Sequence, residues 1–122
     1  MRSAEEKLEF KRKLEQRTAD FAVRTFRLLD SMPVSVSSKV LAFQLGKSAS
    51  SIGANYREAN RSESAADFKH KVSIALKESS ESLYSFELLS QMYPQNAEVT
   101  SLAVECEEML KLFQTIRRHV AV

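Results

Sequence analysis

The two histidines and the single cysteine are the side chains of this chain best suited to hold a metal ion or to act as nucleophiles. A metal centre in a helical bundle needs inward glutamates and two Glu-x-x-His pairs on facing helices. The nearest approach is Asp67-x-x-His70, because Ile116 stands three residues before His119. Cys106 has no second cysteine to pair with, and its apolar neighbours predict a buried, unreactive thiol. The sequence therefore predicts no metal site.

Motifs of other enzyme classes are also missing from the sequence. It contains no glycine-rich phosphate loop, no nucleophile elbow and no Cys–His pair at catalytic spacing. An active site assembled from distant residues would escape such a search. We expect a protein that binds partners rather than an enzyme, with no cofactor and no small-molecule substrate.

The composition is that of one globular, helical domain. The chain has 122 residues, of which 43% are hydrophobic and 28% charged, which is too apolar for a disordered protein. Only two glycines and two prolines occur, so the turns that a many-stranded fold needs are scarce. No secretory signal or membrane-spanning stretch is evident, and we expect a cytoplasmic protein. A net charge of +2 does not by itself indicate nucleic-acid binding.

Four stretches carry apolar residues at three- and four-residue steps, which is typical of amphipathic helices. They predict helices at about 4–32, 36–60, 63–93 and 96–120, in a single domain that spans residues 1–122. Pro33 and Pro94 separate the first pair and the last pair. Because the connections are short, consecutive helices should run antiparallel, as in an up-down-up-down four-helix bundle. Gly46 and Gly53 inside the second helix favour the close approach of a neighbouring helix.

Charge is unevenly distributed between the second and third predicted helices. Residues 36–61 carry four cations against Glu58 alone, and these cations are Lys39, Lys47, Arg57 and Arg61. Arg57 and Arg61, at i and i+4, can form a basic ridge that complements either an acidic helix of a neighbouring subunit or a nucleic-acid phosphate. We favour the neighbouring subunit as the partner of this ridge.

The third predicted helix has a second stripe beside its core stripe. Its members mix apolar residues with carboxylates, and they are Ile74, Glu78, Glu81, Ser85 and Leu88. Such a mixture resembles the rim of a subunit interface, while a solvated charged face is an equally good interpretation. On the second helix, Asn55 lies beside the apolar stripe and is predicted to be a buried polar residue that fixes the register between helices; a binding role is the alternative.

The stretch from Ser51 to Leu89 resembles the S23, or 23S rRNA intervening-sequence, protein family of bacterial four-helix bundles. The resemblance rests on Ala54-Asn55, Glu58-Ala59, the segment 64–68, Ile74-Ala75, and Lys77-Glu78 followed by Glu81. Weaker similarity reaches back through the segments 38–52 and 21–33. The sequence departs from the family at Gly53, where many relatives have proline, and at Tyr56-Arg57.

Membership of this family implies a homo-oligomer, with five bundles arranged around a central axis. Relatives encoded inside ribosomal RNA genes imply RNA as a partner. A related accessory protein of diversity-generating retroelements implies a nucleic-acid enzyme, a reverse transcriptase. Two functional hypotheses follow. The leading one is an RNA- or nucleoprotein-associated oligomer, and the alternative is a protein-binding adaptor or structural oligomer without nucleic acid.

Overall fold

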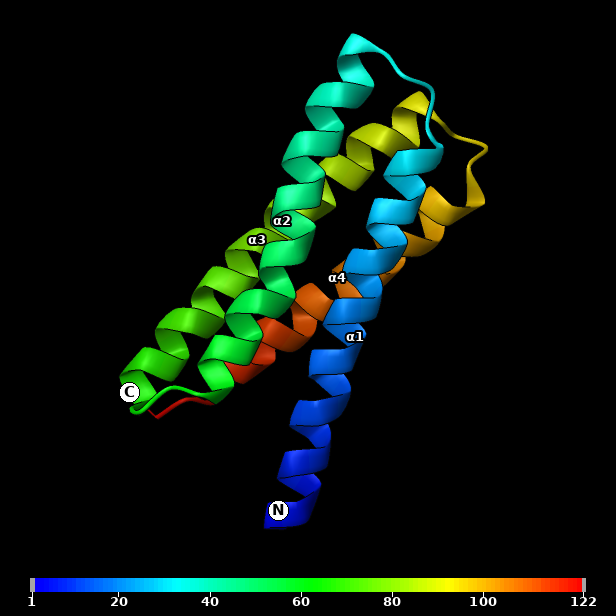
Figure 1. Ribbon diagram of the computed structural model, residues 1–122. Helices are drawn as coiled ribbons and strands as arrows, with labels where there is room; N and C mark the ends of the chain where they lie inside the picture. The colour runs from blue at the N-terminus through cyan, green and yellow to red at the C-terminus, as the bar shows by residue number, and fades with distance from the viewer. Residues whose placement is uncertain (1, 122) are drawn as a thin grey trace.

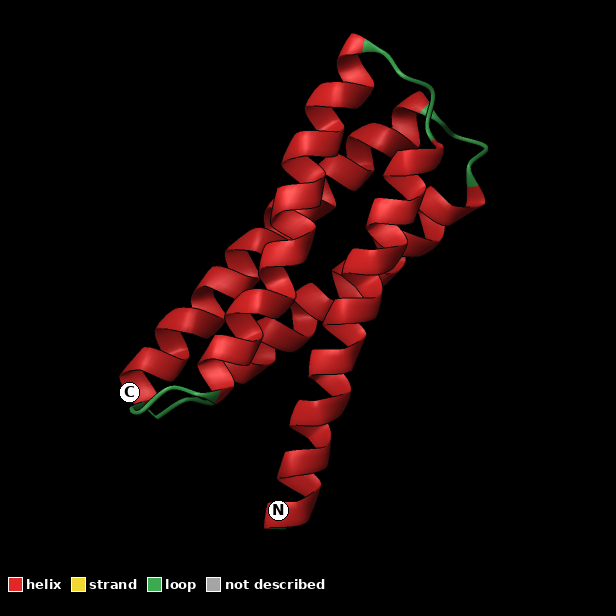
Figure 2. Ribbon diagram, viewed as in Figure 1, coloured by secondary structure: helices red, strands yellow, loops and turns green. Residues whose placement is uncertain are grey.

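Four long helices make up the computed structural model, which describes residues 2–121 and contains no strand in that range (Figure 2). They are α1 (Ala4–Ser31), α2 (Val36–Asn60), α3 (Ala65–Met92) and α4 (Ala97–Arg118). Each helix runs opposite to the one before it, as Figure 1 shows. Contacts join α1 to α2, α2 to α3, α3 to α4 and, more sparsely, α1 to α4. The expected all-helical four-helix bundle is confirmed.

Side chains just before each helix explain where the helices begin. Ser3, Ser35, Ser64 and Asn96 are the four N-caps, and each accepts a hydrogen bond from a backbone N–H of the first turn. Ser3 and Ser35 form complete capping boxes, with Glu6 and Ser38 respectively. Proline follows soon after the ends of α1 and α3, where it prevents the helix from continuing.

The core is a continuous seam built from all four apolar stripes. Two edge-to-face ring pairs link the helices: Phe21 with Phe86 at 5.9 Å between centroids, and Tyr56 with Phe113 at 5.5 Å. Thr18 and Thr25 of α1 are buried in the same seam, and their hydroxyls donate to backbone carbonyls of α1. These bonds satisfy the hydroxyls, so the threonines do not interrupt the core.

Both glycines of the chain mark places where α1 packs closely against α2, as their positions in the sequence predicted. A methyl group at Gly53 would lie 2.7 Å from the Thr18 Oγ1 atom, and one at Gly46 would lie 3.1 Å from a ring carbon of Phe26. The two sites differ in what surrounds them, because Thr18 is buried whereas the Phe26 ring is 45% exposed. Only the contact at Gly53 is rigid on both sides.

The first part of α1 projects beyond the bundle (Figure 1). Leu14 is the first fully buried residue of the helix, and every described residue before it is exposed or only half-buried. We call residues 4–13 the arm. Local contacts support its helical form, since Ser3 and Glu6 cap it and the guanidinium of Arg2 lies 4.3 Å from the centroid of the Phe10 ring.

We predict that Gly53→Ala destabilises the protein, although alanine is the better helix former by roughly 1 kcal/mol. The added methyl overlaps the buried Thr18 hydroxyl, and overpacking of this kind costs about 1–3 kcal/mol. The matched control Gly46→Ala meets only the movable Phe26 ring and should be neutral or stabilising. Urea denaturation followed by circular dichroism measures both changes, and Thr18→Ala should relieve the cost in the Gly53→Ala background. Equal effects at the two glycines would contradict the close contact.

A second prediction concerns Cys106, whose thiol is buried and donates to the Ser79 carbonyl oxygen at 3.3 Å. Burial raises the pKa of this thiol to about 12, so almost no thiolate exists at neutral pH. Cys106 should therefore resist a disulfide-exchange reagent at pH 8 in the native protein and react fully in urea. Rapid labelling of the native protein would place the thiol outside the core.

Candidate functional site

A groove of about 740 Å³ runs between α2 and α3. Two aromatic side chains flank it and are unusually exposed for their size: Phe43 of α2 is 72% exposed and Tyr84 of α3 is 62% exposed. Charged groups from both helices line it, and these are Lys47, Lys77, Glu78 and Glu81. The groove therefore combines apolar contact area with a pair of carboxylates, which is a composition suited to a partner with both apolar and cationic groups.

The two carboxylates of this groove are near Lys47 and Lys77 but form no ion pair with them. Glu78 is half-buried and Glu81 is exposed, one turn further along α3. Among residues 2–121, neither forms an ion pair within 4.0 Å. Burial, followed by the neighbouring charge of Glu81, raises the pKa of Glu78, and the more distant Lys77 and Lys47 oppose that shift only partly. A cation supplied from outside would lower the cost of keeping Glu78 ionised.

The other members of the predicted α3 stripe lie in different surroundings. Ser85 is buried, and Leu88 is half-buried and packs against the chain's own core. Ile74 is half-buried without belonging to the residues that cover the core. Leu88 is thus already used by the bundle, and the part of the stripe open to a partner is centred on Glu78 and Glu81.

The predicted basic ridge of α2 is exposed along its whole length. Arg57 is engaged by α1, with its Nε atom 3.6 Å from Glu15, and Arg61 donates to the Arg57 carbonyl oxygen at the end of its own helix. Lys47 lines the groove beside the carboxylates, while Lys39 lies two turns earlier. The structure brings only Lys47 of these four close to Glu78, and the functional role of the ridge stays a prediction.

Asn55 is not the buried polar residue that we expected. It is half-buried, and its side-chain amide donates to the Ser51 carbonyl oxygen of the same helix at 2.8 Å. The physical reason is its position at the edge of the α2 stripe, between exposed Ala54 and buried Tyr56. This hydrogen bond stays within α2, so it does not link α2 to another helix of the chain. A buried hydrogen bond between Ser48 and Ser82 instead links α2 to α3, at 2.8 Å.

A second groove, of about 500 Å³, lies between α3 and α4 and is strongly cationic. Its charged lining consists of Lys69, Arg117 and Arg118, and no carboxylate is among the described residues that line it. Arg117 is held in place by a 2.8 Å hydrogen bond from its Nε to the Ser73 hydroxyl. The sequence alone does not reveal this cluster, because Lys69 is far from the two arginines in the chain and its proximity to them depends on the fold.

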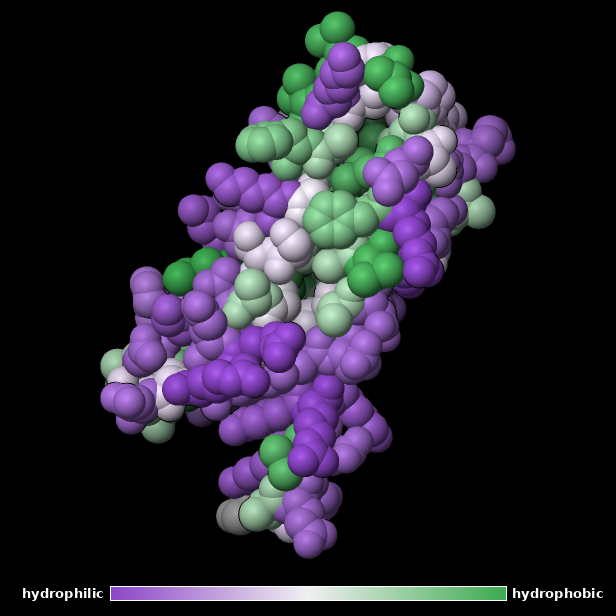
Figure 3. Space-filling view, viewed as in Figure 1, coloured by the Kyte–Doolittle hydropathy of each residue, from purple (hydrophilic) through white to green (hydrophobic). Residues whose placement is uncertain are grey.

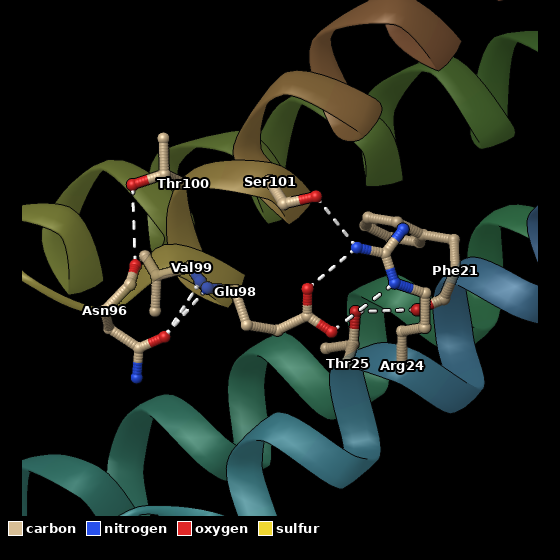
Figure 4. A network of polar contacts seen from close by, with 8 residues as sticks. All are labelled: Phe21, Arg24, Thr25, Asn96, Glu98, Val99, Thr100 and Ser101. Carbon is tan, nitrogen blue, oxygen red and sulfur yellow. Dashed lines mark hydrogen bonds and ion pairs between the residues drawn. The ribbon is translucent and has the colours of Figure 1, made fainter.

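Ion pairs provide much of the link between α1 and α4. Arg17 binds Glu105 through two nitrogens at 2.7 and 2.6 Å and also reaches Glu108. Arg24 binds Glu98 at 2.8 Å and Ser101 at 2.9 Å, as Figure 4 shows. The Arg17 guanidinium lowers the pKa of Glu105. Glu105 is therefore half-buried and paired across the bundle.

The described residues do not suggest a metal centre or a membrane span. No group of three or more His, Cys, Asp or Glu side chains between residues 2 and 121 is placed to hold a metal ion. Over the same range, no helix is both long enough and apolar enough to cross a bilayer. The space-filling view shows apolar side chains gathered over α1 and α2, whereas the projecting arm is mainly hydrophilic (Figure 3).

Comparison with known proteins connects this geometry to a family. The family described as 23S rRNA-intervening sequence protein matches residues 11–115. A crystal structure from Bacteroides thetaiotaomicron VPI-5482, described as a protein with unknown function from the S23 ribosomal protein family, is similar with a TM-score of 0.73 and 35% identity. That similarity covers 84% of this chain and 96% of the other. No curated protein sequence matches.

The matched residues include the core of all four helices, the α2–α3 groove and most of the α3–α4 groove, but only the end of the arm. The resemblance seen between Ser51 and Leu89 is thus part of a similarity along most of the chain. The chain belongs to the 23S rRNA-intervening sequence protein family.

Proposed function

We propose that this chain is a non-enzymatic, homo-oligomeric bundle that associates with RNA in the cytoplasm through its α3–α4 groove. The observation that carries the proposal is the clustering of Lys69, Arg117 and Arg118 around a groove without a carboxylate in its described lining. Guanidinium groups pair well with phosphate, and the hydrogen bond from Arg117 to Ser73 orients one of them in advance. The name of the family, which refers to 23S rRNA, is consistent with this partner.

Oligomerisation strengthens the case for a polyanionic partner. One groove with three cations can form only a few phosphate contacts, which would give weak binding at physiological salt. A ring of copies, five in the assembly that the family resemblance implies, would present the groove repeatedly to one RNA molecule. Contacts to a single polymer then reinforce one another through effective concentration. The net charge of +2 per chain is therefore sufficient if the cations are clustered and repeated.

The test is filter binding of a structured RNA at a series of salt concentrations. Arg117→Gln with Arg118→Gln should weaken binding and lower the salt slope, by roughly 0.7–0.9 for each phosphate contact that is lost. The matched control is Lys39→Gln with Arg61→Gln, which removes the same charge from the α2 ridge. We expect little change in the control. A larger loss in the control would move the contact to the predicted ridge.

The second candidate function is a protein-binding adaptor or structural oligomer. The exposure of Phe43 and Tyr84 beside the α2–α3 groove favours it, because aromatic side chains are enriched where proteins meet. If the wild-type protein binds no RNA even at low salt, while light scattering shows an oligomer, this adaptor function replaces RNA association. Circular dichroism of each variant shows whether a loss of binding reflects a loss of fold.

A further inference from the structure

The α2–α3 groove and the arm have complementary surfaces that the single chain leaves unpartnered. In the groove, Glu78 and Glu81 lie together beside the exposed rings of Phe43 and Tyr84. Lys47 and Lys77 belong to the same lining, but no cation among residues 2–121 lies within 4.0 Å of either carboxylate. A half-buried carboxylate next to a second carboxylate is costly unless a cation compensates it. The corresponding half-buried carboxylates elsewhere, Glu15 and Glu105, both have an arginine partner.

The arm carries the matching groups on one face. Ala4, Lys7, Leu8 and Lys11 follow the i, i+3, i+4, i+7 spacing that places residues on one side of a helix, whereas Glu5, Glu6 and Glu9 belong to the other side. Leu8 is 49% exposed, and neither Lys7 nor Lys11 forms an ion pair with any other described residue. This face therefore presents one apolar side chain between two cations.

The arm cannot reach the groove of its own chain. Over residues 2–121, no Cα atom of α1 lies within 8 Å of a Cα atom of α3, and the two helices meet in the core through side chains such as Phe21 and Phe86. They therefore lie diagonally across the bundle. The arm also continues the rigid helix that is buried from Leu14 onward, and it points away from the other helices (Figure 1). The groove that receives an arm must belong to another copy.

We propose that the arm of one copy docks into the α2–α3 groove of the next. Leu8 contacts the Phe43 and Tyr84 rings, and Lys7 and Lys11 pair with Glu78 and Glu81. The spacings agree, because Lys7 and Lys11 are about 6 Å apart along their helix axis and the two glutamates about 4.5 Å apart along theirs. This inference rests on the homo-oligomeric part of the proposed function and identifies the surfaces that the oligomer uses.

Such a contact joins two different surfaces of the same protein, so it is heterologous and repeats from copy to copy. Heterologous contacts produce a closed ring when the rotation between neighbours closes, and an open filament when it does not. Every copy then uses its arm once and its groove once. The sequence had favoured the Arg57 and Arg61 ridge as the partner of an acidic helix in a neighbouring subunit. Arg57 already pairs with Glu15, whereas the arm lysines Lys7 and Lys11 form no ion pair with another residue in the range 2–121.

The experiment is a charge exchange, read by sedimentation velocity and light scattering on the full chain over a range of concentrations. The arm variant Lys7→Glu with Lys11→Glu and the groove variant Glu78→Lys with Glu81→Lys should each weaken self-association on the order of 100-fold, because like charges then meet. The variant that combines all four substitutions should associate again, since an acidic arm meets a basic groove. An equimolar mixture of the arm and groove variants should also associate.

The matched control is Arg27→Glu with Lys39→Glu, which changes the net charge as much as the arm variant does but lies outside the arm and the groove. It should keep the wild-type mass. Circular dichroism checks that the reversed arm remains helical, which we expect because acidic residues are favourable near a helix N-terminus.

The outcomes separate this inference from the proposed function. A wild-type monomer at all concentrations would overturn the homo-oligomer together with arm docking. A wild-type oligomer whose size is unchanged in the arm variant overturns arm docking alone. If both single-surface variants dissociate and the combined variant does not recover, the two surfaces are needed separately and do not face each other. RNA binding is measured separately: a variant that dissociates should bind RNA more weakly because the repeated grooves are lost, while the Arg117→Gln, Arg118→Gln variant should lose RNA binding and keep its size.

Discussion

The close packing of α1 against α2 at Gly53 determines how the rest of the bundle is arranged around α1. Thr18 is buried against a residue that has no side chain, and a methyl group at Gly53 would lie 2.7 Å from the Thr18 hydroxyl oxygen, so the two helices leave no room for a side chain between them. Seven residues earlier, Gly46 receives the Phe26 ring and continues the same line of contact. Because α1 packs closely against α2, its contact with α4 is sparser. Two long side chains of α1 span that distance, with Arg17 paired to Glu105 and Arg24 paired to Glu98.

Charge in this protein is of two kinds. Arg17, Arg24 and Arg57 are used internally, each to hold α1 to a neighbouring helix. The other charged clusters lie at the α2–α3 groove, the α3–α4 groove and the arm. In the α3–α4 groove, Arg117 also joins α4 to Ser73 of α3. The net charge of the chain is only +2, but positive and negative charges are concentrated at different places on its surface. It is these local excesses, rather than the total, that give the surface its capacity to discriminate between partners.

The fold could be predicted from the sequence because its determinants are local. Apolar stripes with a helical period, serine caps, and proline after α1 and α3 each act within a few residues of where they stand. The surfaces could be predicted only in part. Glu78 and Glu81 share a helix, so their proximity could be predicted from their spacing alone. The proximity of Lys69 to Arg117, and the ion pair of Arg17 with Glu105, depend on contacts between distant parts of the chain. Asn55 was predicted to be buried but is half-buried, because a residue at the edge of a stripe can direct its side-chain amide to its own helix backbone.

Residues 4–10 of the arm lie ahead of residues 11–115, the part of the chain that matches the family. Phe10 packs against the core, but the described residues before it are exposed, so they can be exchanged with little effect on the stability of the bundle. If arms dock in grooves as proposed, two related bundles expressed in one cell could keep the same fold and still avoid mixed assembly, by changing the arm and the surface of the groove together. Insulation between paralogues would then evolve at two exposed surfaces, without any compensating change in the core.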